Sequence, residues 1–491
     1  GSSEEEWCLF VAVDLLNNLP PEKTDLSDLA RLNLRVSKLA RSRGSSAKEH
    51  ELLLKGLKCL EALGVKWKEY DVTLELYNGV VVSEFSLGKC VTCSLIRRML
   101  MVVLQHLNNP SILTQIGNYG SCQVAINEVL TNAKTNDDKL QAHLHYVKCR
   151  REESEDYSQG VDDGVKVLHL YGFDIPLAPT KTCVAKEEMK LKLALRGKSY
   201  SCLTNLPIAD VPVIAIFSYV VRYALIASRE KIMRILVWRA IQCMLKNGVD
   251  RRFPRIMALY AGLLAKEGKV KNANEIGNIT VALCEKVGDD HEAISMAHAT
   301  VLCQLQPFRN GMERYYTSYK DCKLRGDVEP TLGSMLGYSQ TYIAAGLELG
   351  PLFESKMMVV EEYSRTIDRP GFLLSFQICR QFALNLRKRC DKPTEFLGEA
   401  FNEKEELSKL TGNAHKMALR DSSTLRLQLA FIFCDEDTMV EMLTILKDYP
   451  LTDQMIARGH IRLCFTGLAA IAVGRTVDPQ PFQKLGQNVS L

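Results

Sequence analysis

The chain has 491 residues, of which 46% are hydrophobic and 24% are charged, the balance of an ordinary globular protein. Its 62 basic residues are nearly matched by 58 acidic ones and only 7% of residues are aromatic, so composition indicates neither a polyanion partner nor a base-stacking surface. Sixteen cysteines are scattered singly along the chain, which is typical of reduced, mostly buried thiols and predicts a cytoplasmic, reducing location.

The first part of the chain predicts helices separated by glycine and proline breaks. Residues 7–19 form an apolar, helix-like stretch that stops at Pro20 and Pro21, because proline cannot supply the helical amide. Asp25 or Ser27 can cap the helix that follows. The helices expected in this part cover 26–43, 50–64, 70–87 and 89–106. A brief apolar alternation near residue 80 merges into the helical periodicity, so no strand is predicted there.

The clearest unit covers residues 255–289, which are typical of two helices of similar length folded back on each other. Gly268 ends the first helix and Gly288 the second, because a residue without a Cβ adopts helix-ending conformations at little cost. Ala261 and Ala273 are small where the helices would touch, as in tetratricopeptide-type repeats of about 34 residues. Such a pair cannot cover its own apolar faces, so neighbouring pairs are expected.

Small residues recur at the same place in successive predicted pairs. Cys122 and Gly160 are 38 residues apart. Ala273 and Gly311 are also 38 residues apart, and the 113 residues from Gly160 to Ala273 are close to three such periods. A period of about 33 to 47 residues belongs to tetratricopeptide, HEAT or armadillo-like solenoids. The sequence therefore predicts an all-α, right-handed superhelix of roughly a dozen antiparallel helix pairs.

The most apolar run, 211–228, approaches the length of a membrane span. Pro212 and Arg222 would be costly in lipid and the flanking segments are amphipathic, so we expect a buried solenoid helix and no membrane insertion. Further helices are expected over 330–350, 355–370, 373–390, from Thr394 to Leu410, and on to Gly474. Residues 476–491 lose periodicity, which predicts a frayed tail.

Two Gly-Lys pairs, Gly88-Lys89 and Gly197-Lys198, could belong to a phosphate-binding loop. Such a loop needs a further glycine five residues earlier, and Ser83 or Lys192 stands there instead. Both pairs are therefore interpreted as helix ends.

Cys90 and Cys93 form one CxxC motif, the simplest beginning of a zinc site. Zinc normally needs four ligands, and no second cysteine pair lies at short spacing. In the repeat register Cys93 falls on the small contact position that Cys122 also holds, so helix packing explains this cysteine.

Histidines also fail to give a metal site. His143 and His145 would point about 200 degrees apart on a helix. His291-Glu292 begins like a zinc-protease motif, but the next histidine is His298, too far along the chain for that motif.

The remaining charged runs have ordinary explanations. Asp435, Glu436 and Asp437 lack the spaced oxygen donors and the glycine of a calcium loop, which predicts a solvated turn between helices. The basic runs 150–151, 251–252 and 387–389 are balanced by acids or sit at helix ends. No nucleophile motif is present. We therefore expect no catalytic, cofactor-binding or metal-binding residue.

Several long stretches together resemble one family in order and spacing. They are LARLNLRVSKLARSRGSSAKEHELLLKGLKCLEALG, KEYDVTLELYNGVVVSEF, GNYGSCQVAINEVLTNAKTNDDKLQA, SQGVDDGVKVLHLYGFDIP and ALYAGLLAKEGKVKNANEIGNITVALCEKVGDD. The chain resembles the tetratricopeptide-like region that follows the STAND/AAA-type ATPase module of large signalling proteins. In that family a kinase-like domain often precedes the ATPase, and histidine-kinase or cyclase domains often follow the repeats.

Two segments mark the edges of this resemblance. WCLFVAVDLLNNLPP is similar to the end of the ATPase module's last helix, so residues 1–21 are expected to be its tail or a linker. Residues 22–475 are expected to be one continuous repeat domain, with 476–491 as the tail. The segment around 89–115 departs from the family and looks like an inserted helix pair.

The resemblance implies a non-catalytic arm that binds a protein partner, or the ATPase or kinase domain of its own parent, on a concave helical surface. No cofactor, small-molecule substrate or nucleic acid is expected. Two alternatives stay open: a helical-repeat nucleic-acid binder, whose binding would fall steeply with salt, and an all-α enzyme with an unrecognised site.

Overall fold

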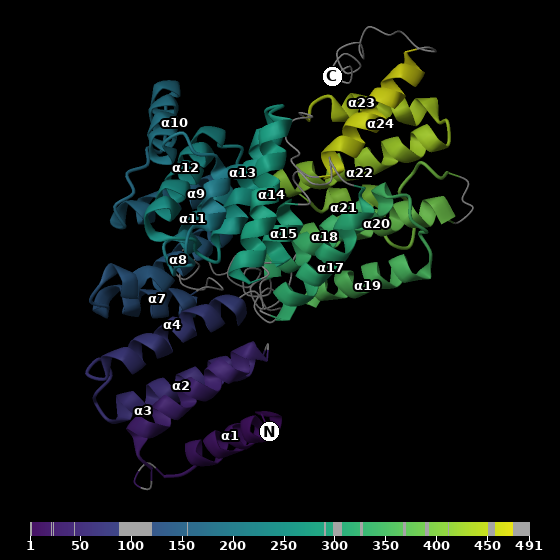
Figure 1. Cartoon of the computed structure of the whole chain (residues 1–491). Helices are drawn as coiled ribbons and strands as arrows, with labels where there is room; N and C mark the ends of the chain where they lie inside the picture. Colours follow the sequence, from purple (N-terminus) through teal and green to yellow (C-terminus); the bar gives the residue numbers. More distant parts are fainter. Residues whose placement is uncertain are drawn as a thin grey trace, which may run out of the picture. The chain divides into compact units, whose positions relative to one another are not determined.

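The fold was analysed in a computed structural model (Figure 1). The structure describes residues 2–20, 22, 24–43, 45–87, 120–154, 156–288, 291–297, 307–324, 328–366, 370–387, 392–410, 412–449 and 457–474. Within these ranges every regular element is a helix, and the only β-type pairings are isolated bridges, Ile208 with Val249 and Leu397 with Asn402. The predicted all-α helical-repeat class is confirmed.

The chain divides into two compact units, and the first consists mainly of residues 1–256. From α1 to α9, each described α-helix packs on the next described one. Helix α9 also packs on α11, and both α10 and α11 pack on α12. Its helices are α1 (Ser2–Asn17), α2 (Leu26–Ser42), α3 (Ser46–Ala62), α4 (Tyr70–Leu87), α7 (Gly120–Asn132), α8 (Asn136–Ser154), α9 (Tyr157–Leu170), α10 (Lys181–Leu195), the 3-10 helix η2 (Tyr200–Asn205), α11 (Ile214–Ile226) and α12 (Glu230–Asn247).

The second unit consists of residues 257–284, 291–319 and 329–491, so helix α13 (Phe253–Lys266) begins in the first unit and ends in the second. Its prominent helix contacts join α19 to α20, α20 to α22, and α22 to α23 and α24. The helices are α14 (Val270–Val287), α15 (His291–Ala297), α17 (Arg309–Leu324), α18 (Val328–Ala344), α19 (Pro351–Thr366), α20 (Pro370–Arg387), α21 (Glu403–Ser408), α22 (Gly412–Ile432), α23 (Glu436–Leu446) and α24 (Ala457–Val473). That residues 22–475 form one continuous repeat domain stays a prediction.

Local signals in the sequence give correct helix ends. Helix α1 stops at Asn17, before Pro20, and helix α4 has the predicted bounds. Asp25 caps α2, since its Oδ1 accepts hydrogen bonds from the amides of Ser27 at 2.9 Å and Asp28 at 3.1 Å. Helix termini leave amides without helical partners, so such caps fix where a helix begins.

The helix pair predicted at residues 255–289 is present as α13 and α14. Gly268 and Gly288 follow the two helices with φ of 72° and 95°, in the left-handed region that favours glycine. Ala261 and Ala273 are fully buried, and Cys122, Gly160 and Gly311 at the corresponding repeat positions are also buried. All five predicted contact positions are therefore buried.

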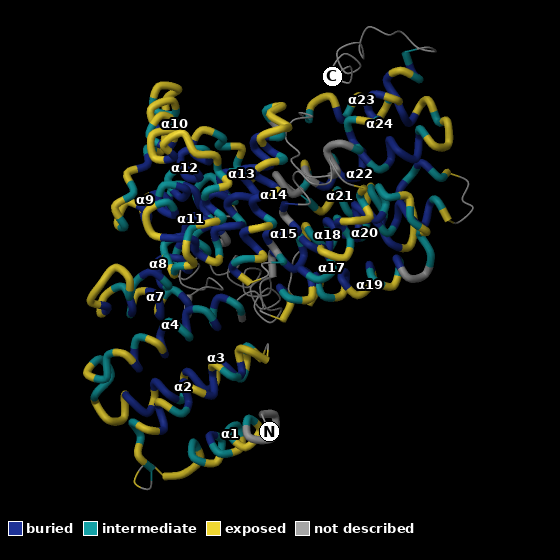
Figure 2. Tube along the Cα trace, in the orientation of Figure 1, coloured by how far each residue is buried: buried dark blue, intermediate teal, exposed yellow. Residues whose placement is uncertain are grey.

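The apolar run 211–228 contains helix α11 (Ile214–Ile226), most of whose residues are buried (Figure 2). The predicted buried helix is therefore confirmed. No helix in the described ranges combines the length and the apolar character that a membrane crossing requires.

The helix predicted from Thr394 to Leu410 is wrong. Residues 392–402 form a loop that contains the Leu397–Asn402 bridge, and only the six residues of α21 are helical. Side chains from α20 and α22 hydrogen-bond the backbone of this loop, and these tertiary contacts override the local helical preference. The predicted inserted pair around 89–115 and the predicted tail over 476–491 lie outside the described residues.

A close backbone crossing follows α12 in the first unit. The amide of Val249 donates to the carbonyl of Pro207 at 2.8 Å, and the amide of Ala209 donates to the carbonyl of Val249 at 3.0 Å. Gly248 has a φ of 102°, and a Cβ there would lie 2.7 Å from the Pro207 carbonyl oxygen. Only glycine fits both the conformation and the space.

Gly248→Ala is expected to lower the free energy of unfolding of the first unit by about 2 to 3 kcal/mol, from backbone strain and the clash with Pro207 together. Gly172→Ala is the matched control, since Gly172 also has a positive φ but a Cβ added there would meet no atom within 4 Å. Gly172→Ala therefore introduces backbone strain without a clash, and it is expected to lower the free energy of unfolding by about 1 kcal/mol. Urea unfolding followed by tryptophan emission measures both, and equal effects would contradict the role of the crossing.

Candidate functional site

Of the two Gly-Lys pairs, the structure describes Gly197-Lys198, which lies at the end of a helix. Gly197 follows α10 with a φ of 75°, and the Ser199 side chain caps η2. Gly88-Lys89, Cys90 and Cys93 lie outside the described residues.

His143 and His145 are both buried in α8 but bind different groups. His143 Nδ1 lies 3.0 Å from the Tyr171 hydroxyl, whereas His145 Nδ1 lies 2.9 Å from the Gln141 carbonyl. Burial lowers the pKa of His143 and raises that of Tyr171, so a neutral hydrogen-bonded pair is favoured. No group of three metal-ligating side chains occurs in the part of the chain that the structure describes, which does not include His298.

The basic run at residues 150–151 is engaged within the protein. Arg150 lies 3.7 Å from the Asp163 carboxylate. Arg151 is buried, with its guanidinium 4.6 Å from the ring centroid of Tyr157 and 5.7 Å from that of Tyr223. Sequence reasoning missed this burial, because tyrosines on other helices create the cation–π site.

Helix α22 carries an unusual concentration of buried polar side chains. Six of them fall within eight residues, namely Asp421, Ser422, Ser423, Thr424, Arg426 and Gln428. Burying polar groups is unfavourable unless they find hydrogen-bond partners, so such a run in the middle of a helix calls for a structural or functional explanation. The run DSSTLRLQ is visible in the sequence, but its burial depends on helices from elsewhere in the unit.

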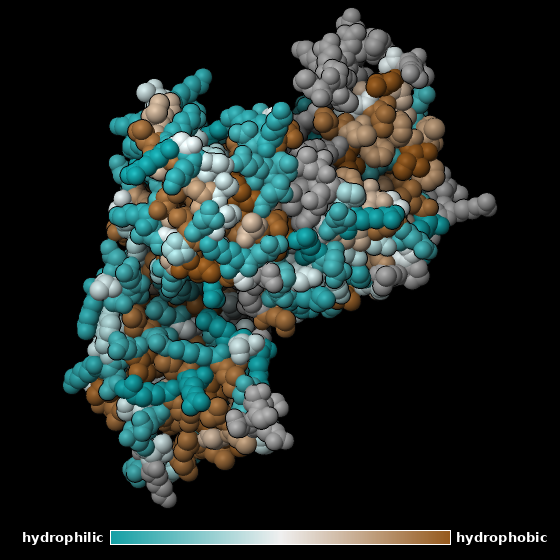
Figure 3. All heavy atoms as spheres, in the orientation of Figure 1, coloured by the Kyte–Doolittle hydropathy of each residue, from teal (hydrophilic) through white to brown (hydrophobic). Residues whose placement is uncertain are grey.

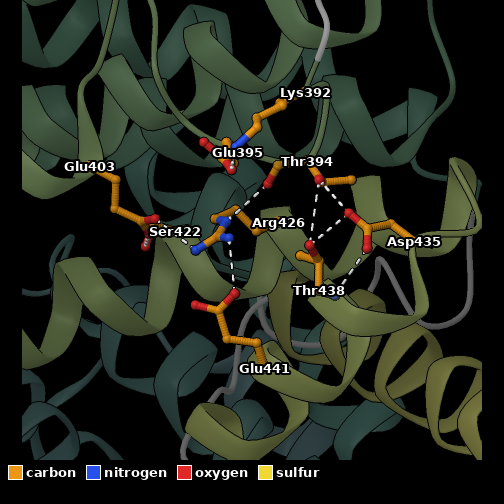
Figure 4. Close-up of polar contacts among 9 residues, drawn as sticks. All are labelled: Lys392, Thr394, Glu395, Glu403, Ser422, Arg426, Asp435, Thr438 and Glu441. Carbon is orange, nitrogen blue, oxygen red and sulfur yellow. Dashed lines mark hydrogen bonds and ion pairs between the residues drawn. The ribbon is translucent and has the colours of Figure 1, made fainter.

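One side of this run forms an ion network (Figure 4). Arg426 donates to the Thr394 carbonyl at 3.0 Å, to Glu403 at 2.8 Å and to Glu441 at 3.3 Å. Its side chain is only 10% exposed, and Ser422 donates a further hydrogen bond to Glu403. A guanidinium with three directed acceptors is well suited to joining separate segments.

Asp435, in the predicted inter-helix turn, extends this network. It caps α23 and accepts hydrogen bonds from the hydroxyls of Thr394 at 2.6 Å and Thr438 at 2.7 Å. Burial alone would raise the pKa of Asp435, but these hydrogen bonds outweigh burial and keep the pKa below its ordinary value. Glu436 and Asp437 are exposed, as predicted, but they belong to the first turn of α23 and not to the turn between the helices, and Asp435 caps that helix.

Helix α20 holds the other side of the loop 392–402. Gln381 Oε1 accepts from the amides of Ala400 and Phe401, both at 3.1 Å. Asn385 Nδ2 donates to the carbonyls of Pro393 and Glu395 at 3.0 and 2.8 Å. The polar atoms of this network are used to fasten the loop, so its chemistry is structural.

The opposite side of the polar run faces a cavity between α18, α20, α22 and α24. Its empty volume, opening included, is about 440 Å³. The lining residues are Gln340, Ile343, Ser375, Ile378, Cys379, Asp421, Thr424, Leu425, Gln428 and Ile461. The spacing of Asp421, Thr424 and Gln428 places them on one face of α22. Four helices create this site, so the sequence alone did not reveal it.

The outer face of α1 carries large apolar side chains, and apolar surface gathers in this part of the first unit (Figure 3). Trp7, Val11 and Leu15 follow each other at four-residue spacing and are exposed, with Trp7 63% and Leu15 65% accessible. The inner face is fixed on α2, since Val13 is buried and Asn17 exchanges hydrogen bonds with Asn33 at 2.9 Å. A helix that is apolar on both faces is typical of one that is covered on both sides.

Comparison with known proteins gives no family model and no curated protein that matches the chain.

Proposed function

We propose that the chain is a protein-binding scaffold, the helical-repeat arm of a nucleotide-dependent signalling protein, and that α1 docks the ATPase-type module of that parent. The observation that carries this proposal is the exposed row of Trp7, Val11 and Leu15 on a helix whose inner face is already packed. Large apolar side chains in a row are typical of interface centres, where a few of them provide most of the binding energy.

The wider features of the chain support a binding role. Successive packed helices provide extended surface, as repeat proteins do. The resemblance to the repeat region of STAND/AAA-type proteins supplies the identity of the parent, and a reducing cytoplasmic location belongs to the same proposal.

The test is binding between this chain and the ATPase-type module of its parent, each purified separately. We expect Trp7→Ala with Leu15→Ala to weaken binding about tenfold or more, because both side chains would be buried at the contact. Calorimetry or biolayer interferometry gives the dissociation constant, and circular dichroism checks that the variant is folded.

The control is Met189→Ala with Leu193→Ala on α10, another exposed apolar pair at four-residue spacing in the same unit. It should bind as the unaltered chain does. Equal losses in the two variants would contradict docking through α1, and a parent gene without an ATPase-type module would contradict the assigned parent.

A further inference from the structure

Two buried cysteines of the first unit lie with their sulfur atoms in contact. Cys122, in the first turn of α7, and Cys149, in the second half of α8, belong to the same apolar core cluster and are at most 1% exposed. Their Sγ atoms are 3.7 Å apart, and both side chains are thiols. A disulfide joins sulfurs about 2.0 Å apart, so the two atoms need to approach by less than about 2 Å to form one.

The hydrogen bonds of the pair turn the two sulfurs toward each other. The Cys122 thiol lies 3.5 Å from the carbonyl oxygen of Val81 in α4, to which it donates. Its sulfur then accepts from the Cys149 thiol, because a thiol carries a single hydrogen. A bond between the two sulfurs therefore requires no side chain to leave the space between them.

The position of Cys122 decides how a reagent reaches this buried pair. Helix ends open at a lower free-energy cost than the core of a unit, and Cys122 lies in the first turn of its helix. A small oxidant can therefore reach Cys122 without unfolding of the whole unit. Cys149 lies deeper within its own helix, so we expect it to react second, with the oxidised Cys122.

We propose that Cys122 and Cys149 form a redox-sensitive pair, in which a peroxide joins α7 to α8 through a disulfide. The Cys122 thiolate attacks one oxygen of hydrogen peroxide and becomes a sulfenic acid, while the O–O bond breaks and hydroxide leaves. The Cys149 thiolate then attacks the sulfenic sulfur, the S–O bond breaks and a second hydroxide leaves. Each hydroxide takes up the proton of one thiol, so two thiols and one peroxide give one disulfide and two waters.

The disulfide is expected to stabilise the first unit. It restricts the unfolded chain across the 27 positions that separate the two cysteines, and such a restriction raises stability where the native geometry is kept. In a reducing compartment the pair would be reduced at rest and joined only during oxidation. This inference does not depend on α1 or on the proposed scaffold role.

Mild oxidation of the intact, reduced chain tests the proposal. Trypsin releases each cysteine in a peptide of its own, residues 99–134 for Cys122 and residues 149–150 for Cys149, so mass spectrometry identifies their linkage. After hydrogen peroxide treatment and blocking of the remaining thiols, we expect these two peptides to be joined. The thermal transition followed by tryptophan emission, which reports the first unit, should rise by about 5 °C or more and return with dithiothreitol.

Three variants control the test, each compared with its own reduced form. Cys122→Ala and Cys149→Ala should lose both the linkage and the stabilisation, whereas Cys59→Ala should keep both, because Cys59 is buried elsewhere in the same core cluster. Oxidation of the exposed Cys8 verifies that the peroxide is active. Oxidised Cys8 with unlinked Cys122, linkage only in urea, or a lower melting temperature after linkage would each overturn the proposal.

Discussion

Arg426→Met is expected to destabilise the second unit by about 3 to 5 kcal/mol, because it removes one partner of a buried ion pair and leaves Glu403 uncompensated. Methionine keeps a long side chain at this position, so no large cavity forms. The loss of stability therefore reports the removal of the guanidinium group. Arg426→Met with Glu403→Leu should recover much of the loss, since the unpaired buried charge is then absent.

The three tryptophans make the measurement specific to one unit. Trp7, Trp67 and Trp238 all lie in the first unit, so tryptophan emission follows that unit alone, whereas far-ultraviolet circular dichroism follows both. In urea we expect the dichroism transition of Arg426→Met to move to lower concentration by about 1 M or more, while the emission transition is retained.

Lys392→Met is the control for the loss of a positive charge. Lys392 donates to Glu395 at 2.8 Å in the same region, but its side chain is 70% exposed, so we expect little change in the transition midpoint (Figure 4). Similar losses in the two variants would contradict a special role for the buried guanidinium.

Ala273→Glu is expected to destabilise the second unit by about 3 kcal/mol or more. Ala273 is fully buried in α14, so the substitution places a larger, charged side chain where no water reaches. Thermal unfolding followed by circular dichroism measures the effect, and the neutral variant Ala273→Gln separates the contribution of charge from that of size.

The neighbouring residue supplies the control for Ala273. Asn272→Glu adds the same carboxylate to the same first turn of α14 at an exposed position, where the helix amino terminus favours negative charge. Its melting temperature should stay the same or rise. An unchanged melting temperature in Ala273→Glu would contradict the contact position assigned to Ala273.

The sequence predicted features that depend on a few neighbouring residues. Asp25 begins α2 through its own side chain, and Gly268 ends α13 through its own backbone conformation, so both could be identified locally. The buried helix α11 follows from apolar side chains on all of its faces.

Features made by distant residues could not be predicted in this way. The segment from Thr394 to Leu410 has a helical composition, but Gln381 and Arg426 supply hydrogen bonds that hold part of it as a loop. The cavity was missed for the same reason, since Gln340 and Asp421 belong to helices that meet only in the folded unit.

The way in which the loop 392–402 is fastened affects how such a chain can evolve by gaining or losing repeats. Where helices pack mainly on their neighbours, as α2, α3 and α4 do, a helix pair can be duplicated or deleted by re-forming the two contacts at its ends. The loop is hydrogen-bonded to α20, to α22 and to the cap of α23. Deletion of a helix pair within residues 370–446 would therefore leave the remaining helices without some of these hydrogen bonds. We therefore expect this stretch to be inherited as one block, even where the number of repeats around it changes.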